Sequence, residues 1–197
     1  MFDTVLVANR GEIAARIITV LKTRGIRSVA IYSDADEDAE HVRRADTAYR
    51  VGPPPVAQSY LDQDAIFNAV KASGAQAIHP GYGLLSENAN FARRCETEGV
   101  RFIGPSAATI DDMGDKVRAR TMAQQANVPI VPGSDGPIQN DDEAASLAAN
   151  IGYPVLVKAA GGGGGIGMAL VKKPAKLARA LSSCRDRGES SFGNPSI

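Results

Sequence analysis

Hydrophobic residues in the first half of the chain form short runs, and segments with helical spacing lie between them. Four apolar runs are expected to be strands: residues 4–8, 28–32, 77–80 and 100–103. Between the first two runs, apolar residues recur at helical spacing, at Ile13, Ile17, Val20 and Leu21, and Gly25 is expected to end that helix. Further helices are expected over residues 62–73 and 88–98. Continuous apolar strands that alternate with helices predict a parallel sheet covered on both faces.

The pattern changes after residue 113. Residues 115–127 are expected to be helical, 128–137 to be a Pro/Gly-rich connector, and 141–151 to be a second helix. Apolar runs at 153–159 and 168–172 predict two strands on either side of a glycine-rich segment. A last helix is expected over residues 174–187, and residues 188–197 are polar without a clear pattern. The change divides the chain into a first domain, 1–113, and a second, 114–197.

Three loops are expected to meet at one edge of the first sheet. They follow predicted strands at residues 9–12, 33–36 and 79–88, whereas 51–55 is expected to be a rigid, proline-rich loop. Parallel sheets bind ligands beyond the carboxyl ends of their strands, so the three loops are candidates for a site. Taken singly, His79 is expected to be a structural residue at a strand end, and Glu12 to favour a helix N-terminus. Asp34 lacks the glycine fingerprint that would make it a ribose-binding acid.

The charge balance excludes some classes of partner. Basic and acidic side chains each number 22, and the chain contains no basic block. We therefore expect no general attraction to nucleic acid or to an anionic membrane, and any anion site is local. Cys95 and Cys184 form no CxxC pair, which favours two reduced, buried cysteines. Because the first residues also lack a signal-peptide pattern, we expect a cytoplasmic protein without a membrane segment.

Five consecutive glycines, residues 161–165, are the most informative feature of the chain, and Ile166 and Gly167 follow them. Strand-forming residues stand on both sides, so the run is expected to be the tip of a hairpin, not a dinucleotide fingerprint or a P-loop. Without Cβ atoms, such a tip can approach phosphates closely and close over a nucleotide. A plain flexible linker is the alternative, although linkers are usually mixtures of Gly and Ser.

Two lysines support a phosphate site. Lys158 ends the apolar run before the glycines, and Lys116 follows Met113-Gly114-Asp115. A lysine about 4 Å from a phosphate has a Coulomb energy of roughly 4 kcal/mol per unit charge near a protein surface, before desolvation. Taken alone, Lys116 can also be interpreted as a solvent-exposed helix residue without a ligand.

Long motifs surround these residues. They are VANRGEIAARI at 7–17, HPGYGLLSENANFA at 79–92, FIGPS at 102–106, MGDKVRAR at 113–120, VPGSDGP at 131–137 and IGYPVLVKAAGGGGGIGM at 151–168. In these motifs the chain resembles biotin carboxylase, the ATP-grasp component of acyl-CoA carboxylases and pyruvate carboxylase. The resemblance is collinear over nearly the whole chain. It implies an α/β fold with a Rossmann-like parallel sheet, the pre-ATP-grasp domain, followed by the first half of an ATP-grasp lid subdomain.

The resemblance also implies an activity. ATP would activate bicarbonate to carboxyphosphate, and CO2 would then pass to the ureido nitrogen of biotin on a carrier. The positions that match ATP-binding residues of the family are Lys116, Lys158, Gly163, Gly164, Gly165 and Met168. Tyr82 and Glu87 match positions near biotin and bicarbonate. The expected cofactors are ATP and Mg²⁺, and the expected partners are a biotin carboxyl carrier protein or domain, a carboxyltransferase subunit and a second copy in a homodimer.

The family's enzyme is more than twice as long as this chain. The resemblance therefore implies that the Mg²⁺ ligands and the catalytic residues lie in the remainder, and no turnover is expected from these 197 residues alone. Two other interpretations stay open. One is a non-catalytic binding or assembly module, or a degenerate remnant of the enzyme. The other is a different ATP-grasp ligase, such as a carbamoyl phosphate-type synthetase, against which the HPGYG and SEN motifs argue.

Ile166 departs from the family, which usually has Arg or Lys at this position. The missing cation predicts weaker closure over the nucleotide. Ile166→Arg should therefore tighten ATP binding in an otherwise complete enzyme, which calorimetry can measure. An unchanged affinity would show that position 166 has no part in binding.

Overall fold

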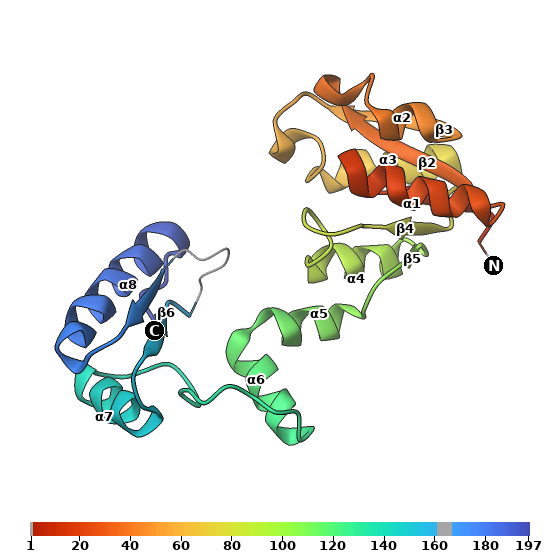
Figure 1. Ribbon diagram of the computed structural model, residues 1–197. Coiled ribbons are helices and arrows are strands. Elements are labelled where there is room, and N and C mark those ends of the chain that lie inside the picture. The colour runs from red at the N-terminus through yellow and green to blue at the C-terminus, as the bar shows by residue number, and fades with distance from the viewer. Residues whose placement is uncertain (1, 161–166) are drawn as a thin grey trace. The chain divides into compact units, whose positions relative to one another are not determined.

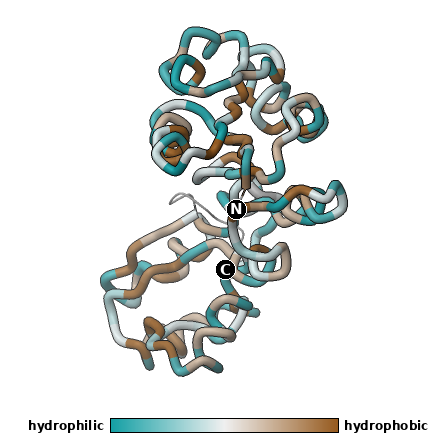
Figure 2. Tube along the Cα trace, turned by 90° about the vertical axis from the view of Figure 1, so that its right-hand side faces the viewer, coloured by the Kyte–Doolittle hydropathy of each residue, from teal (hydrophilic) through white to brown (hydrophobic). Residues whose placement is uncertain are grey.

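The computed structural model describes residues 2–160 and 167–197 (Figure 1). The chain divides into two compact units: unit 1 is Met1–Gly114 and unit 2 is Asp115–Ile197. Each unit has its own hydrophobic core. Hydrophobic and hydrophilic stretches follow one another along helical parts of the tube, a pattern typical of helices with one buried face (Figure 2).

Unit 1 contains a five-stranded sheet in which all strands are parallel, in the order β3-β2-β1-β4-β5. The strands are β1 (Thr4–Val7), β2 (Arg27–Ser33), β3 (Thr47–Gly52), β4 (Ala77–His79) and β5 (Arg101–Phe102). The parallel α/β sheet predicted from the sequence is confirmed. Short helices connect the strands: α1 (Gly11–Thr23), η1 (Asp34–Asp36), α2 (Glu40–Arg44), η2 (Val56–Gln58), α3 (Gln63–Ser73), α4 (Ala89–Thr97) and α5 (Ala107–Gly114).

Helices cover both faces of this sheet (Figure 1). On one face, Val5 and Val7 of β1 pack with Ile18 of α1. On the other, Leu6 of β1 belongs to the same cluster as Phe67 of α3. Successive residues of a strand point to opposite faces, so burial on both sides requires an unbroken apolar strand, which is what the sequence shows.

Three predicted helices begin one residue later than expected because the first polar residue is the N-cap. The Asp62 carboxylate accepts from the Ala65 N–H at 3.1 Å, and the Asn88 side chain accepts from the Phe91 N–H at 2.9 Å. Asp115 caps α6 in the same way. Asp and Asn are favoured at N-caps because they satisfy N–H groups that the first turn leaves without a partner.

The apolar pattern does not predict strand β3, and the prediction of a rigid loop over 51–55 is wrong for Val51 and Gly52. β3 is an edge strand that pairs only with β2, and Thr47 and Arg50 are exposed. An edge strand therefore lacks the continuous apolar run that marks a central one. The pattern also misses the short helices α2 and α5.

Unit 2 is built on a two-stranded antiparallel hairpin. Its elements are α6 (Lys116–Gln125), α7 (Asp141–Ile151), β6 (Val155–Lys158), β7 (Met168–Val171), η3 (Pro174–Lys176) and α8 (Leu177–Phe192). Val157 and Val171 of the hairpin pack with Ala148 of α7 and with Leu181 and Cys184 of α8. The predicted strand pair on either side of the glycines is confirmed.

The last helix is longer than predicted, because α8 continues through Gly188. This glycine is buried inside the helix, and a Cβ there would lie 2.5 Å from the Asn194 carbonyl oxygen. After α8 the chain folds back, and the Ala160 N–H donates to the Ser196 carbonyl at 2.8 Å. Gly188, the first residue after the predicted helix, is thus a site of close packing.

Candidate functional site

One face of the β6–β7 hairpin is exposed and largely apolar. Lys158 pairs with Met168, and Leu156 pairs with Leu170. Opposed residues of an antiparallel pair lie on the same face, as do residues two apart along a strand, so these four side chains share one face. Leu156 is 46% exposed, Met168 39% and Leu170 59%, whereas Val157 and Val171 on the opposite face are buried. We call these four residues the hairpin face.

Lys116 reaches the end of the hairpin from another element. It is the first residue of α6, which begins after the N-cap Asp115. Its Nζ donates to the Ala160 carbonyl oxygen at 3.3 Å, two residues beyond Lys158. The structure therefore brings Lys116, Lys158 and Met168 together in unit 2, although 42 residues separate the two lysines in sequence.

This arrangement suits a nucleotide. Apolar side chains on an open face can cover a flat ring, and a few polar or charged groups beside them fix its orientation. Ammonium groups next to that face supply charge for phosphate oxygens. Lys116 and Lys158 both have exposed side chains.

The backbone on both sides of the glycine run is defined. The Ala159 N–H donates to the Gly167 carbonyl at 2.8 Å, which continues the strand pairing by one step. Gly167 has φ +73°, and a Cβ there would lie 2.8 Å from the Ala159 Cβ, so the position requires glycine. Gly163, Gly164 and Gly165, which the sequence assigns to ATP, lie outside the described residues, as does Ile166.

Tyr82 and Glu87 lie in the loop that follows β4 in unit 1. Tyr82 is 65% exposed, and Glu87 is also exposed. Positive φ angles at Gly81, Gly83 and Leu84 turn the loop sharply. Both side chains are therefore open to a solute at the carboxyl end of the sheet, where the sequence predicts a site.

Asn9 anchors this loop. This residue is buried, with 4% of its surface exposed. Its side-chain amide donates to the Pro80 carbonyl at 2.7 Å and to the Tyr82 carbonyl at 2.9 Å. Gly81 lies between these two residues with φ +67°, and a Cβ there would meet the Asn9 amide nitrogen at 2.8 Å. The His79 ring accepts the Gly81 N–H at 3.0 Å, in keeping with the structural role expected for His79. No local pattern signals the role of Asn9, because its partners lie about 70 residues away.

A charged cluster joins the first two loops of this sheet edge. Arg10 donates to both carboxylate oxygens of Asp36 at 2.6 Å, and the Tyr60 hydroxyl donates to Asp36 at 2.6 Å. These donors stabilise the carboxylate, chiefly Arg10, and hold the pKa of Asp36 at about 2. Burial and the neighbouring carboxylate raise the pKa of Tyr60, so its hydroxyl stays protonated and donating.

Three other titratable side chains of unit 1 have defined surroundings. Asp34 forms an ion pair with Arg50, with 2.6 Å between the Asp34 Oδ1 and the Arg50 Nε. The buried His41 ring lies with its Nε2 3.2 Å from the Ile31 carbonyl oxygen, and burial lowers the pKa of His41. Burial also raises the pKa of Cys95 to about 12, so this thiol stays protonated.

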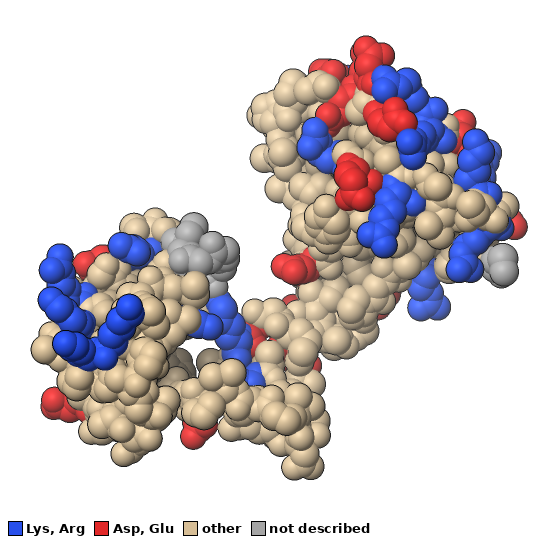
Figure 3. All heavy atoms as spheres, viewed as in Figure 1, with Lys and Arg blue, Asp and Glu red and all other residues tan. Residues whose placement is uncertain are grey.

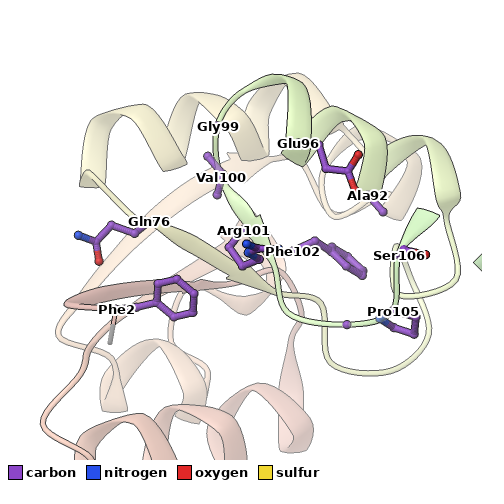
Figure 4. A pocket seen from close by; sticks show the side chains of 11 residues that line it. Phe2, Gln76, Ala92, Glu96, Gly99, Val100, Arg101, Phe102, Pro105 and Ser106 are labelled. Atoms are coloured by element: carbon purple, nitrogen blue, oxygen red, sulfur yellow. The ribbon is translucent and has the colours of Figure 1, made fainter. Parts of the chain in front are cut away.

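A hollow of about 530 Å³ lies along the outer edge of β5 (Figure 4). Phe2, Gln76, Arg101 and Phe102 surround it, and none of the predicted site residues lines it. Within the described ranges, no three His, Cys, Asp or Glu side chains are grouped so that they could hold a metal ion. Over the same ranges, no helix is both long and apolar enough to cross a bilayer.

The chain matches two described protein families, one in each half. Residues 1–110 match the family described as "Biotin carboxylase, N-terminal domain", and residues 115–197 match "Carbamoyl-phosphate synthase L chain, ATP binding domain". The chain belongs to the biotin carboxylase family.

Relatives of this family match nearly the whole chain. The biotin carboxylase of Halalkalibacterium halodurans is 53% identical over 98% of the chain and 43% of its own length. A crystal structure of a Campylobacter jejuni biotin carboxylase–βγ-ATP complex has a TM-score of 0.92 at 41% identity, over all of the chain and 44% of its own. Another similar structure is the biotin carboxylase domain dimer of Hydrogenobacter thermophilus 2-oxoglutarate carboxylase, in complex with MgADP, ADP and bicarbonate. Its TM-score is 0.88 at 46% identity, and the match covers 100% of this chain and 43% of that one.

The chain thus spans less than half the length of these biotin carboxylases. The second family description names carbamoyl-phosphate synthase, but the relatives that match the whole chain are biotin carboxylases. They do not support the interpretation as a carbamoyl phosphate-type synthetase.

Sequence reasoning misses Leu156 and Leu170 as members of the hairpin face. A signal for both is present: they stand two residues from Lys158 and Met168, on the same side of each strand. The continuous apolar runs of the two strands hide the difference between their faces.

Asn9→Ala should loosen the loop that carries Tyr82. The substitution leaves the Pro80 and Tyr82 carbonyls without this donor, so we expect a loss of about 1–3 kcal/mol in the free energy of unfolding. Hydrogen exchange should become faster at residues 81–84. Asn90→Ala, on the exposed side of α4, is the control and should change neither quantity. Unchanged exchange in the loop would contradict the anchoring role.

Asp36→Asn should lower the free energy of unfolding of unit 1 at neutral pH. The native pKa of Asp36, about 2, is below its unfolded value of about 3.9, so its stabilisation is complete above pH ~4 and is lost as the pH falls toward 2. We expect a loss of about 1–2 kcal/mol at pH 7, with allowance for solvent screening around the half-exposed Arg10. Urea unfolding at a series of pH values measures it.

The matched control for this experiment is Asp34→Asn in the same short helix. The ion pair with Arg50 also lowers the pKa of Asp34, but both side chains are exposed and screened by solvent, so this replacement should change the dependence on pH between 4 and 2 less than Asp36→Asn does. Equal curves for the two variants would show that the Asp36 cluster does not stabilise unit 1.

Proposed function

We propose that this chain supplies the pre-ATP-grasp domain, residues 1–113, and the start of the ATP-grasp domain, residues 114–197, of an ATP-dependent biotin carboxylase. The enzyme carboxylates carrier-linked biotin with bicarbonate. The observation that carries the proposal is the hairpin face, where Lys158 stands among exposed apolar side chains with Lys116 beside it. The Campylobacter jejuni relative was crystallised as a βγ-ATP complex, which supports a nucleotide as the ligand.

In this proposal the hairpin face covers the nucleotide. Leu156, Met168 and Leu170 contact its flat, apolar part, because these side chains are exposed on one face. Lys158 and Lys116 bind phosphate oxygens. Gly163, Gly164 and Gly165 are assigned to the same phosphates because they match ATP-binding positions of the family.

The reaction proceeds in two steps. A bicarbonate oxygen attacks the γ-phosphorus of ATP, which forms carboxyphosphate and releases ADP. Carboxyphosphate then yields CO2 and phosphate, the phosphate accepts the proton of the biotin ureido nitrogen, and that nitrogen takes up the CO2. Lys116 and Lys158 contribute to the first step, because a fixed positive charge stabilises the negative charge carried by the transferring phosphoryl group and ADP.

Tyr82 and Glu87 are proposed to orient biotin and bicarbonate. A phenol can donate a hydrogen bond to an anionic oxygen, and a carboxylate can accept one from bicarbonate or from the ureido group. Their exposure and the anchored loop support this role. Mg²⁺ neutralises phosphate charge in such reactions, and we expect its carboxylate ligands outside this chain.

The proposed partners follow from the same reaction. They are a biotin carboxyl carrier protein or domain, a carboxyltransferase subunit and a second copy of the enzyme. The Hydrogenobacter thermophilus relative crystallised as a dimer, which supports the last of these. The cytoplasmic location expected from the sequence stays a prediction.

Calorimetric titration of the chain with MgATP tests the proposal. Lys158→Met should weaken binding at least about tenfold, or about 1.4 kcal/mol, because a charged hydrogen bond to phosphate is lost. Lys116→Met should act in the same direction, and so should Leu156→Ser, which removes apolar contact area. All three residues are exposed, so the variants should fold.

Lys22→Met, an equal loss of charge at an exposed position of α1, is the control and should bind as the unaltered chain does. If Lys158→Met and Lys22→Met bind MgATP with the same affinity, the assignment of the hairpin face is wrong.

A further inference from the structure

Unit 2 carries a group of exposed cations that the proposed nucleotide site does not use. Four cations lie close together in sequence, and all four are exposed: Lys172 and Lys173 directly after β7, Lys176 at the end of η3, and Arg179 in the first turn of α8. Figure 3 shows Lys and Arg side chains gathered on the α8 side of unit 2. We call these four residues the basic surface.

The basic surface has no local counter-charge. Residues 144–185 contain neither Asp nor Glu. Arg185, further along α8, pairs with Asp141 at 2.7 Å, but among the described residues none of the four cations forms an ion pair with a carboxylate. Lys176 and Arg179 are also three residues apart, a spacing at which like charges on a helix repel.

The core of unit 2 does not use these charges. The inner face of α8 is buried through Leu177, Leu181 and Cys184, which does not depend on the outer residues. Lys176 is the N-cap of α8 and Arg179 lies in its first turn, where the helix dipole disfavours positive charge. Positive charges in a position that lowers stability indicate an anionic ligand whose binding offsets that loss.

We propose that the basic surface binds an acidic surface of the carrier protein that presents biotin, a partner that follows from the proposed function. Ion pairs across such a surface guide association and fix orientation, and they lose strength as salt is added. The surface thus adds a docking contact outside the site where biotin reacts.

A protein partner fits better than a nucleic acid or a membrane. Residues 154–191 contain no Phe, Tyr or Trp, so aromatic stacking on bases is not available around this surface. Unit 2 has ten basic and seven acidic residues, whereas unit 1 has twelve and fifteen. The excess of acid in unit 1 disfavours a long polyanion or an anionic bilayer, but not a small acidic patch.

The test compares charge reversals in the 197-residue chain. Lys173→Glu/Lys176→Glu alters the basic surface, and Lys22→Glu/Arg24→Glu makes the same change of charge at exposed positions of unit 1. The probe is a purified biotinylated carrier domain from a carboxylase of one of the relatives, titrated at low and high salt. A short RNA duplex and vesicles with anionic lipid are titrated in parallel. Circular dichroism verifies folding, and Lys172→Glu/Arg179→Glu serves as a second surface variant.

We expect both surface variants to bind the carrier about tenfold more weakly than the control at low salt, since each loses two surface ion pairs and gains two repulsions. The difference should nearly vanish at high salt. Carrier binding that is equal in the surface variants and the control overturns the proposal. Binding of RNA or vesicles without binding of the carrier overturns it as well.

Titration of the same variants with MgATP separates this proposal from the proposed function. The surface variants should bind MgATP as the unaltered chain does. If the unaltered chain binds no MgATP but binds the carrier through the basic surface, the nucleotide assignment fails and the docking surface stands. If the chain binds MgATP and the surface variants bind the carrier normally, the docking surface fails and the nucleotide assignment stands.

Discussion

The register of the β6–β7 pair is the constraint on which unit 2 depends. Because Val157 and Val171 face α7 and α8, the alternation of side chains puts Leu156, Lys158, Met168 and Leu170 on the other face. A shift of β6 by one residue would bury Lys158 and expose Val157. The core of unit 2 therefore fixes which side chains remain available to a ligand.

The same hairpin gives the other parts of the site their places. At the end of the hairpin, Lys116 of α6 donates a hydrogen bond to the Ala160 carbonyl, and the Ala160 N–H donates one to the Ser196 carbonyl of the final segment. Gly167 and Gly188 both lie against Ala159, where a larger residue would clash. Elements far apart in sequence thus converge on the end of β6, next to Lys158.

In unit 1, hydrogen bonds between loops perform the corresponding task. Asn9 holds the loop after β4, and Arg10 holds Asp36 in the loop after β2. Adjacent residues at the end of β1 therefore tie together loops from both sides of the central strand. This explains how exposed residues such as Tyr82 are held by a backbone whose φ angles are unusual at Gly81, Gly83 and Leu84.

Some of this is predictable from the sequence, for identifiable reasons. Central strands such as β1 are apolar throughout because both faces are buried, so the parallel sheet can be predicted, whereas the half-exposed edge strand β3 cannot. Lys158 and Met168 stand beside an obvious glycine run. The contacts of Asn9, and the Arg10–Asp36–Tyr60 cluster, join segments distant in sequence, and no local pattern marks such pairs.

The most direct test of nucleotide binding by the hairpin face is photolabelling of the chain with 8-azido-ATP, followed by mass spectrometry of the labelled peptides. If the hairpin face covers the nucleotide, the label should lie on the strands at Leu156, Met168 or Leu170, and excess ATP should suppress it. Labelling confined to unit 1, or labelling that excess ATP does not reduce, would contradict this role of the hairpin face.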